Sequence, residues 1–266
     1  MTDFSKIASH YEKTSIVQRS ASNELFDLIK ITETDDVLDL GCGTGELTKK
    51  IREITKGKVI GIDSANGMIE IARQTYSQCN ISFEICSAEN LNYNEQFDVI
   101  FCNSTFQWFK NPVTVLRNCY RALRKNGRMS VQAPARKIYS PNFVKEVDCV
   151  NTDPRTKEIF SRFNSPWFFL ETAEDYRNLF ENLGFEVLYS RIDEVITSHT
   201  PDEVFNIFNS GASAGYLNQQ YYDVSLIEEY IETFKKIVKD SFIRQANSNG
   251  EVDLVFFRIY LLAKKC

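Results

Sequence analysis

Hydrophobic and polar positions alternate with two different periods along the first half of the chain. Short apolar runs predict buried strands, and the segments between them carry apolar residues at helical spacing. The expected strands are residues 37–40, 58–62, 81–85, 97–102 and 128–132, and the expected helices are residues 44–54, 65–76 and 113–123. Strands that alternate with helices are typical of right-handed crossovers, and therefore of a doubly wound parallel sheet.

The pattern changes on either side of this core. Residues 4–30 have apolar positions at helical spacing, which predicts one or two amphipathic helices ahead of the first strand. Four of the six prolines lie within residues 134–170, and this favours loops and short helices there. Thr172 and Asp175 form a capping pattern that predicts a helix start, and Gly184 is expected to end that helix.

The end of the chain completes the expected fold. Two long apolar strands are expected at residues 185–198 and 252–263, separated by a helical segment at residues 201–240. We therefore expect an α/β fold with a Rossmann-like, doubly wound sheet of seven strands. Most strands should be parallel, and an antiparallel hairpin should form one edge. N-terminal helices and a mainly helical cap complete the expected fold. The expected division is residues 1–30 as helices over the ligand, 31–135 as the ligand-binding core, 136–170 and 199–250 as cap insertions, and 171–198 and 251–266 as segments that complete the sheet.

Composition and charge exclude several classes of protein. The net charge is −5 and no block of Lys and Arg is present, so a nucleic-acid partner is not expected. No apolar run approaches the roughly 18 residues of a membrane helix, and the first residues do not have the pattern of a secretion signal. The seven cysteines are scattered and form no CxxC pair, which is typical of reduced thiols in a cytoplasmic protein. With two histidines in the chain, a metal site is not expected.

The strongest chemical signal is the stretch Asp39-Leu40-Gly41-Cys42-Gly43-Thr44-Gly45, between the first expected strand and helix. Glycines at alternate positions let the backbone turn tightly and approach a ligand, and Asp63 ends the second strand, where a carboxylate can accept both hydroxyls of a ribose. The spacing is G-x-G-x-G, and Asp39 beside it would repel a pyrophosphate. A cationic nucleoside ligand is therefore favoured over NAD(P), and a glycine turn without a ligand is the remaining alternative.

Three longer stretches resemble a known family. The sequence VLDLGCGTG at residues 37–45, with GID at 61–63, resembles the class I S-adenosylmethionine-dependent methyltransferases over residues 31–133. The stretch FDVIFCNSTFQW at residues 97–108 is similar to trans-aconitate methyltransferases and to the malonyl-acyl-carrier-protein O-methyltransferases of biotin synthesis. Residues 7–22, IASHYEKTSIVQRSAS, resemble the second group. Both groups methylate a free carboxylate, so the resemblance implies the same chemistry here.

The resemblance implies a set of residues that bind S-adenosylmethionine. Asp39 would lie near the amino group, Asp63 would hold the ribose, and Met68 would pack on the adenine. The family commonly has Asp where this chain has Ser87, so either Ser87 or Glu89 would read the adenine edge. The other implied cofactor residues are Gly41, Gly43, Gly45, Ser64, Ala88, Asn103, Ser104, Tyr11 and Arg19.

The acceptor is less well defined by the sequence. Phe106, Gln107 and Trp108 would face it, and Arg136 is the favoured cation for an acidic acceptor. No catalytic base is assigned, because no histidine lies near these motifs and a carboxylate is already ionised at neutral pH. The alternatives are N- or O-methylation of another small apolar metabolite, and a non-catalytic protein that binds the cofactor.

The expected partner is a small acceptor, free or bound to an acyl carrier, and the chain is expected to be a monomer or homodimer. A carrier would need a basic surface on this chain. A run of cations could supply that surface, or it could be the solvated face of a helix; the run is Arg117, Arg121, Arg124, Lys125 and Arg128.

Aromatic residues are concentrated in the second half of the chain, where 13 of the 20 Phe and 8 of the 12 Tyr follow Ala135. This excess predicts an aromatic cap that favours an apolar or long-chain acceptor and excludes water.

Overall fold

The computed structural model describes residues 16–266, with side chains from Ser22 onward. Seven strands form one sheet in the order β3-β2-β1-β4-β5-β7-β6. The strands are β1 (Val37–Leu40), β2 (Val59–Asp63), β3 (Ser82–Ile85), β4 (Phe97–Asn103), β5 (Leu123–Pro134), β6 (Phe185–His199) and β7 (Val252–Lys265). Strands β1 to β5 are parallel, and β7 pairs antiparallel with both β5 and β6. The predicted fold class is confirmed.

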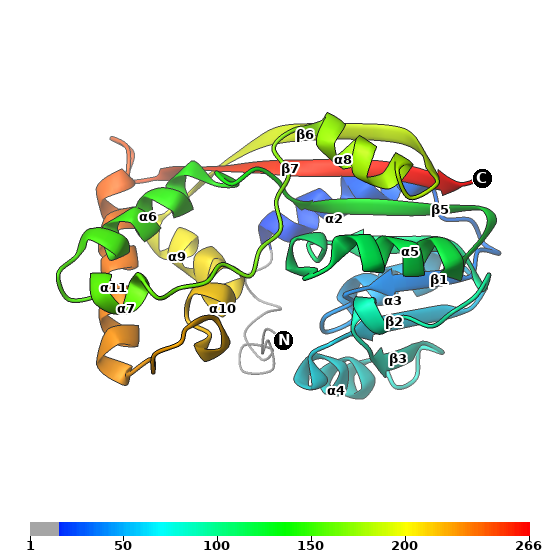
Figure 1. The fold of residues 1–266 in the computed structure, drawn as a ribbon, viewed down its shortest axis with the longest axis horizontal. Coiled ribbons are helices and arrows are strands. Elements are labelled where there is room, and N and C mark those ends of the chain that lie inside the picture. Colours follow the sequence, from blue (N-terminus) through cyan, green and yellow to red (C-terminus); the bar gives the residue numbers. More distant parts are fainter. Residues whose placement is uncertain (1–15) are drawn as a thin grey trace.

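Helices cover both faces of the sheet (Figure 1). On one face, α5 (Pro112–Ala122) and α8 (Ala173–Glu181) pack on apolar residues of β4, β5 and β7. On the other face, α2 (Ile16–Ile29) and α3 (Glu46–Ile54) cover β1 and β4, and α4 (Asn66–Thr75) packs beside β3. Two single-turn helices, η2 (Ala88–Asn90) and η3 (Phe106–Trp108), follow β3 and β4. They lie at the carboxyl ends of the parallel strands, where open α/β sheets bind ligands.

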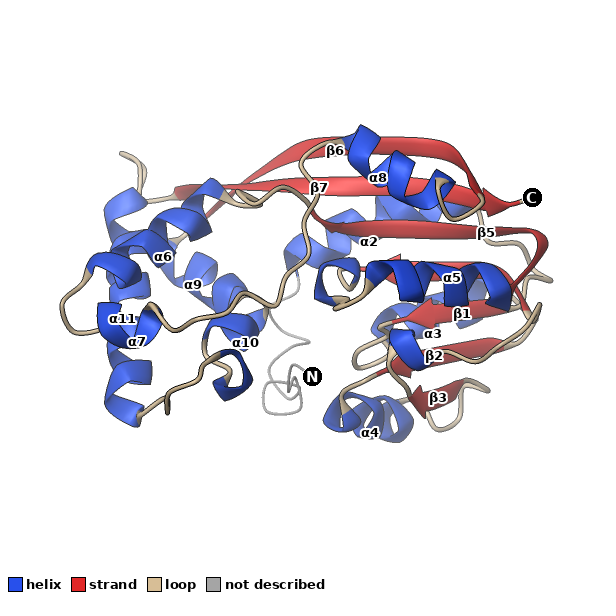
Figure 2. Cartoon of the chain, viewed as in Figure 1, coloured by secondary structure: helices blue, strands red, loops and turns tan. Residues whose placement is uncertain are grey.

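A second, mostly helical body lies beside the sheet (Figure 2). It contains α6 (Pro141–Thr152), α7 (Lys157–Phe160), α9 (Pro201–Ser210), α10 (Ser213–Tyr216), η4 (Gln219–Tyr221) and α11 (Glu228–Gln245). These helices share an apolar cluster of their own, which includes Phe143, Phe208, Phe234 and Phe256. Strands β6 and β7 extend from the sheet into this cap (Figure 1), so the cap is connected to the core by paired strands. The predicted segment boundaries remain a prediction.

Two predicted elements differ from the structure by five residues at one end. Strand β5 begins at Leu123, directly after α5, rather than at residue 128. Leu123 pairs with Phe97 and Arg128 pairs with Val99, so the intervening residues, with Asn126 at φ 65°, bulge out of the ladder. Helix α11 continues to Gln245, five residues beyond the predicted end. The capping box at Thr172 and Asp175 is present as predicted.

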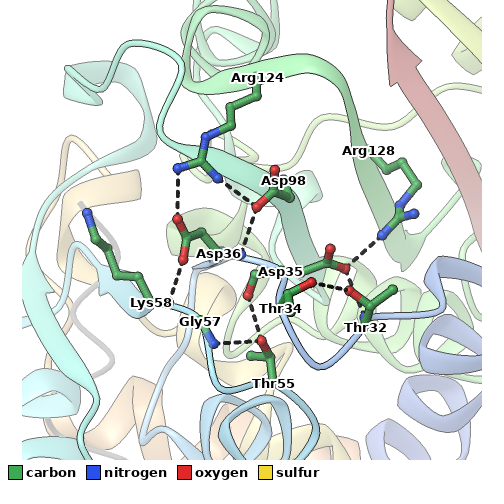
Figure 3. Close-up of polar contacts among 10 residues, drawn as sticks. All are labelled: Thr32, Thr34, Asp35, Asp36, Thr55, Gly57, Lys58, Asp98, Arg124 and Arg128. Carbon is green, nitrogen blue, oxygen red and sulfur yellow. Dashed lines mark hydrogen bonds and ion pairs between the residues drawn. The ribbon is translucent and has the colours of Figure 1, made fainter.

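Ion pairs connect the loop before β1 to the segments around it (Figure 3). The Arg124 guanidinium donates to Asp36 at 2.7 Å and to Asp98 at 2.6 Å, and Arg128 donates to Asp35 at 2.8 Å. Arg121 donates to the carbonyls of Leu91 and Tyr93. Three cations of the predicted basic run therefore have partners within this protein. These internal contacts weaken the interpretation of the run as a docking surface for a carrier. Within residues 16–266, no helix combines the length and apolar content needed to cross a membrane.

Candidate active site

A cavity of about 440 Å³ opens at the carboxyl ends of β1, β2 and β4 and continues beneath the cap. Its sheet end is lined by the glycine loop, the end of β2, η2 and the end of β4. Its cap end is lined mainly by apolar side chains, which are Tyr139, Phe143, Trp167, Phe169, Ile207 and Phe256. One continuous space therefore joins a polar, glycine-rich wall to an aromatic wall.

The glycine loop has the backbone geometry that the motif predicts. Gly41 has φ 78°, and a Cβ atom there would lie 2.2 Å from the Thr105 Oγ1. Gly43 has φ 54°, and a Cβ atom there would meet no other atom within 4 Å, because this residue borders the cavity. A ligand can therefore approach the backbone at Gly43 closely. Gly45 does not line the cavity and lies against Phe83.

Asp63 lines the cavity beside this loop. Its Oδ2 accepts a hydrogen bond from the Gly43 backbone N–H at 3.1 Å, and its Oδ1 accepts one from the Ala65 N–H at 2.8 Å. Burial raises the pKa of Asp63, and the two N–H groups oppose that effect. A carboxylate has about four acceptor positions, so these bonds orient Asp63 and leave capacity for the hydroxyls of a ribose.

Asp39 lies behind the loop rather than in the cavity wall. The side chain is buried, and the Thr48 hydroxyl donates a hydrogen bond of 2.6 Å to its Oδ2. Burial raises the pKa of Asp39 to about 7. The predicted contact with the cofactor's amino group does not match this position, since the strand β1 points the carboxyl toward α3.

Most of the other predicted cofactor residues line the same end of the cavity; these are Gly41, Gly43, Ser64, Met68, Ser87, Ala88, Glu89, Asn103 and Ser104. Glu89 accepts a hydrogen bond from the Lys110 N–H at 3.1 Å. Ser104 has φ 55° and is held by Gln132, through both its backbone N–H and its hydroxyl. The Asn103 Oδ1 is buried without a hydrogen-bond donor among the described residues. This wall therefore presents acceptor atoms, which fit a cationic ligand with hydroxyl and amino groups.

Two of the predicted acceptor residues line the cavity and two do not. Trp108 lies 5.6 Å, ring to ring, from Trp167 of the cap, and the Gln107 amide donates to the Ser104 carbonyl at 2.9 Å. Phe106 is instead fully buried among Phe109, Phe168, Tyr176 and Phe180, because the turn of η3 directs it into the core.

Arg136 also lies outside the cavity wall. Its guanidinium is 4.4 Å from the centre of the Phe257 ring, and Phe257 points to the opposite face of β7 from the cavity residues Phe256 and Arg258. The proposed contact between Arg136 and an acidic acceptor is therefore not supported. Tyr11 lies outside the described residues, and Arg19 lies in α2 where side chains are not described.

The sequence interpretation missed both cations among the described lining residues of the cavity, Lys110 and Arg258. Arg258 of β7 lines the cavity and is 5% exposed. A signal was present, because Arg258 is the single charged residue in the stretch LVFFRIYLLA at residues 254–263. It could not be placed without knowing which face of β7 adjoins the cap.

The comparisons with known proteins agree with this geometry. A family model described as a methyltransferase domain matches residues 31–184. The malonyl-[acyl-carrier protein] O-methyltransferase of Acetivibrio thermocellus is 33% identical over 127 residues, which are 47% of this chain and 45% of that protein. The enzyme of the same name from Bacillus cereus is 34% identical over 129 residues, 47% of this chain and 48% of that protein. The matched region thus spans about half the length of these relatives.

The fold has solved counterparts. The YcgJ protein of Bacillus subtilis superimposes with a TM-score of 0.60 at 18% sequence identity, over 93% of this chain and 98% of that one. The family model covers more than half of the chain and includes the glycine loop, Asp63 and the end of β4. The chain therefore belongs to the class I S-adenosylmethionine-dependent methyltransferases.

Proposed function

We propose that this methyltransferase transfers the methyl group of S-adenosylmethionine to a carboxylate oxygen of an acid, free or bound to an acyl carrier, and forms a methyl ester. The supporting observation is the distribution of acids in the cavity. Asp63 and Glu89 are the carboxylates among its described lining residues, and both lie at the sheet end and accept backbone hydrogen bonds. The described cap end has no carboxylate or histidine that could remove a proton from an acceptor.

This distribution favours an acceptor that arrives ionised. Tyrosine hydroxyls have a pKa of roughly 10, and burial raises the pKa of Tyr139 above that range. Amines and phenols usually need a base near the proton that they lose. A carboxylic acid has a pKa of roughly 4 and needs none at neutral pH.

The residues of the sheet end would hold the cofactor. Asp63 would accept from the ribose, the backbone at Gly41 and Gly43 would border the methionine portion, and Asn103 Oδ1 would accept from its ammonium group. When bound, the cofactor supplies an electrophilic methyl group on a positively charged sulfur. Met68 and Ala88 provide apolar surface for the adenine.

The transfer is a displacement at carbon. The acceptor's carboxylate oxygen forms a bond to the methyl carbon, the carbon–sulfur bond breaks, and its electron pair stays on sulfur. No proton is transferred, and the products are a neutral ester and S-adenosylhomocysteine. The protein's contribution is alignment and exclusion of water, and alignment alone can supply roughly 7–11 kcal/mol in favourable cases.

The names of the relatives support an acidic acceptor. Both curated proteins are O-methyltransferases of a malonyl group on an acyl carrier protein, and a malonyl thioester has one free carboxylate. A carrier-bound acid is therefore the finer form of the proposal. The internal bonds of Arg121, Arg124 and Arg128 indicate that a carrier would dock elsewhere than on the predicted basic run.

One observation favours a second candidate, methylation of a neutral apolar metabolite on nitrogen or oxygen. Aromatic side chains form most of the cap wall, including Phe143, Trp167 and Phe169, and such a wall accommodates apolar molecules of many kinds. This candidate differs from the first in the charge of the acceptor.

A matched panel of acceptors tests the proposal. Acids, including malonyl-acyl carrier protein, are each paired with the amide or alcohol of the same carbon skeleton, and release of S-adenosylhomocysteine is measured. We expect release with acids and a product that mild alkali hydrolyses. Release with amines or alcohols alone would instead support the second candidate. Calorimetric binding of S-adenosylhomocysteine without release for any acceptor would favour a non-catalytic protein.

A further inference from the structure

Arg258 is a buried cation without a counter-ion among the described residues. It lies in β7 with 5% of its surface exposed and lines the cavity. Its Nε is buried and has no hydrogen-bond partner in the described part of the chain. The carboxylate of its cross-strand neighbour, Asp193, is paired with Arg191 instead. Among the described residues, the Phe256 ring faces the guanidinium, with its centre 5.1 Å from the guanidinium carbon, and Tyr260 also favours the charged form.

This arrangement is unfavourable unless the cavity holds an anion. A buried charge without a partner loses its hydration and gains no Coulomb energy in return. Burial lowers the pKa of Arg258 to about 10, so the guanidinium is still charged at neutral pH. A planar guanidinium with parallel N–H donors is well suited to a carboxylate.

The position of β7 separates Arg258 from the expected cofactor site. In the sheet order, β7 is three strands away from β1, which carries the glycine loop. Three strand spacings of about 4.8 Å amount to roughly 14 Å. Arg258 pairs with Pro134 at the carboxyl end of β5, and the neighbouring cavity residue on the same face of β7 is Phe256 of the cap cluster. Arg258 therefore lies at the junction between the cofactor half and the aromatic half.

We propose that Arg258 binds the carboxylate of the methyl acceptor and selects acids whose apolar body lies against Phe143, Trp167 and Phe169. This inference rests on the proposed function and adds the residue that recognises the acceptor. One carboxylate oxygen accepts from the guanidinium, which leaves the second oxygen to form the bond to the methyl carbon. Methylation removes the negative charge, so the ester loses the ion pair and binds more weakly than the acid.

Binding measured without turnover tests this inference separately from the proposed function. Wild-type protein and the Arg258→Gln variant, each saturated with S-adenosylhomocysteine, are titrated calorimetrically with hexanoate, phenylacetate and malonyl-acyl carrier protein, and with the methyl esters of the two small acids. We expect the wild type to bind at least one of these acids, at least tenfold more tightly than its ester where the ester is available. Arg258→Gln should lose at least tenfold in affinity for that acid, and Arg258→Lys should recover part of it.

Arg136→Gln is the matched control, because its guanidinium also lies over a phenylalanine ring but outside the cavity. We expect Arg136→Gln to bind acids as the wild type does. The affinity of Arg258→Gln for S-adenosylhomocysteine should stay within about twofold of the wild-type affinity. Its melting temperature should not fall, because the substitution removes an uncompensated buried charge.

Three results would overturn the inference. They are failure of the wild type to bind any of the acids, equal affinity for acid and ester, and a loss of S-adenosylhomocysteine affinity in Arg258→Gln as large as the loss for the acid. The last would assign Arg258 to the carboxylate of the cofactor. If acids bind through Arg258 and none is methylated, the inference holds and the proposed function fails.

Discussion

At the scale of single residues, Gly41 and Gly43 make different contributions to the cofactor site. Both have positive φ, so an alanine costs roughly 1–2 kcal/mol at either position. At Gly41 the new methyl group would also overlap Thr105, whereas at Gly43 it would project into the cavity. We therefore expect Gly41→Ala to lower the free energy of unfolding more than Gly43→Ala does.

The same pair of variants should differ in ligand binding. Gly43→Ala should weaken binding of S-adenosylhomocysteine by at least tenfold at a modest cost in stability, because its methyl group occupies ligand space. Urea unfolding and calorimetry measure both quantities. Equal stability of the two variants, with unchanged affinity in Gly43→Ala, would show that the cofactor does not approach this loop.

Asp39 predicts a pH-dependent stability. Burial raises its pKa to about 7, whereas the unfolded chain has a value near 3.8, so the folded state binds the proton more tightly. The stability that this carboxyl contributes is complete below pH 3.8 and is lost as the pH rises to about 7.

Asp39→Asn keeps an acceptor for the Thr48 hydroxyl and cannot ionise. We expect the free energy of unfolding of the wild type, relative to this variant, to fall steadily between pH 5 and pH 7 and then to level off. Urea unfolding at several pH values measures the difference. A difference that is independent of pH would mean that Asp39 has an ordinary pKa.

The sequence identified the cofactor end of the site better than the acceptor end. Residues such as Asp63 and Asn103 follow strands whose carboxyl ends must meet, so their positions follow from the topology. Arg136 follows β5 and Arg258 lies in β7, and which of them enters the cavity depends on the route of the chain after β5 and on the face that β7 turns toward the cap. A hydrophobicity pattern shows neither the route of the chain after a strand nor the face that a strand turns toward the cap.

At the scale of elements, the short helix α10 controls the position of an aromatic residue of the cavity. A Cβ atom at Gly215 would lie 2.3 Å from the Trp167 ring, whereas one at Gly211 would meet nothing within 4 Å. We expect Gly215→Ala to displace Trp167 and weaken acceptor binding by several-fold without changing affinity for S-adenosylhomocysteine. Gly211 also lines the cavity, so the control is Ser213→Ala in the same helix; Ser213 does not line the cavity, and its substitution should change neither.

Intrinsic fluorescence is the measurement for this prediction. Trp108 and Trp167 are the two tryptophans of the chain, and both line the cavity. The emission spectrum of Gly215→Ala should therefore differ from that of the wild type. An unchanged spectrum together with unchanged acceptor affinity would mean that α10 shifts to make room for the methyl group and that Trp167 keeps its position.

The ion pairs of Arg124 stabilise the opposite end of the sheet (Figure 3). Arg124 joins the start of β5 to Asp36 before β1 and to Asp98 in β4, with 41% of its side chain exposed. We expect Arg124→Met to lower the free energy of unfolding by about 1 kcal/mol, and Lys56→Met by less than about 0.5 kcal/mol, since the Lys56–Glu33 pair is largely exposed.

Binding of S-adenosylhomocysteine should be unchanged in both variants, because these pairs lie at the amino ends of the strands. Urea unfolding and calorimetry provide the measurements. Equal effects of the two substitutions on stability would contradict a specific role for Arg124, and a loss of cofactor affinity in Arg124→Met alone would connect this network to the site.

The order of helices and strands was predictable where the two periods alternate clearly. The start of β5 was not, because Leu123 enters the ladder directly from α5 and a bulge with Asn126 then shifts the register. The stretch Lys125-Asn126-Gly127 has the composition of a helix stop, which predicted a turn at this part of the strand. The end of α11 was also missed, because its last turns bury Ser241 and Phe242 while Ile243 is exposed, so the apolar spacing of the helix is interrupted there.

At the scale of the whole molecule, the sheet and the cap are two bodies that share one cavity. Strands β6 and β7 connect the sheet to the cap (Figure 1). The sheet provides a polar wall of acceptor atoms, and the cap provides an aromatic wall, with Arg258 of β7 also lining the cavity. This division assigns the nucleoside to the sheet and the acceptor to the cap, so the reacting carboxylate would meet the methyl group between them.

A crystal structure with bound S-adenosylhomocysteine tests this division most directly. We predict ribose hydroxyls within hydrogen-bond distance of Asp63, adenine beside Met68 and Ala88, and open space between the sulfur and an Arg258 guanidinium that does not touch the cofactor. A nucleoside under the cap, or a methionine carboxylate paired with Arg258, would contradict the account.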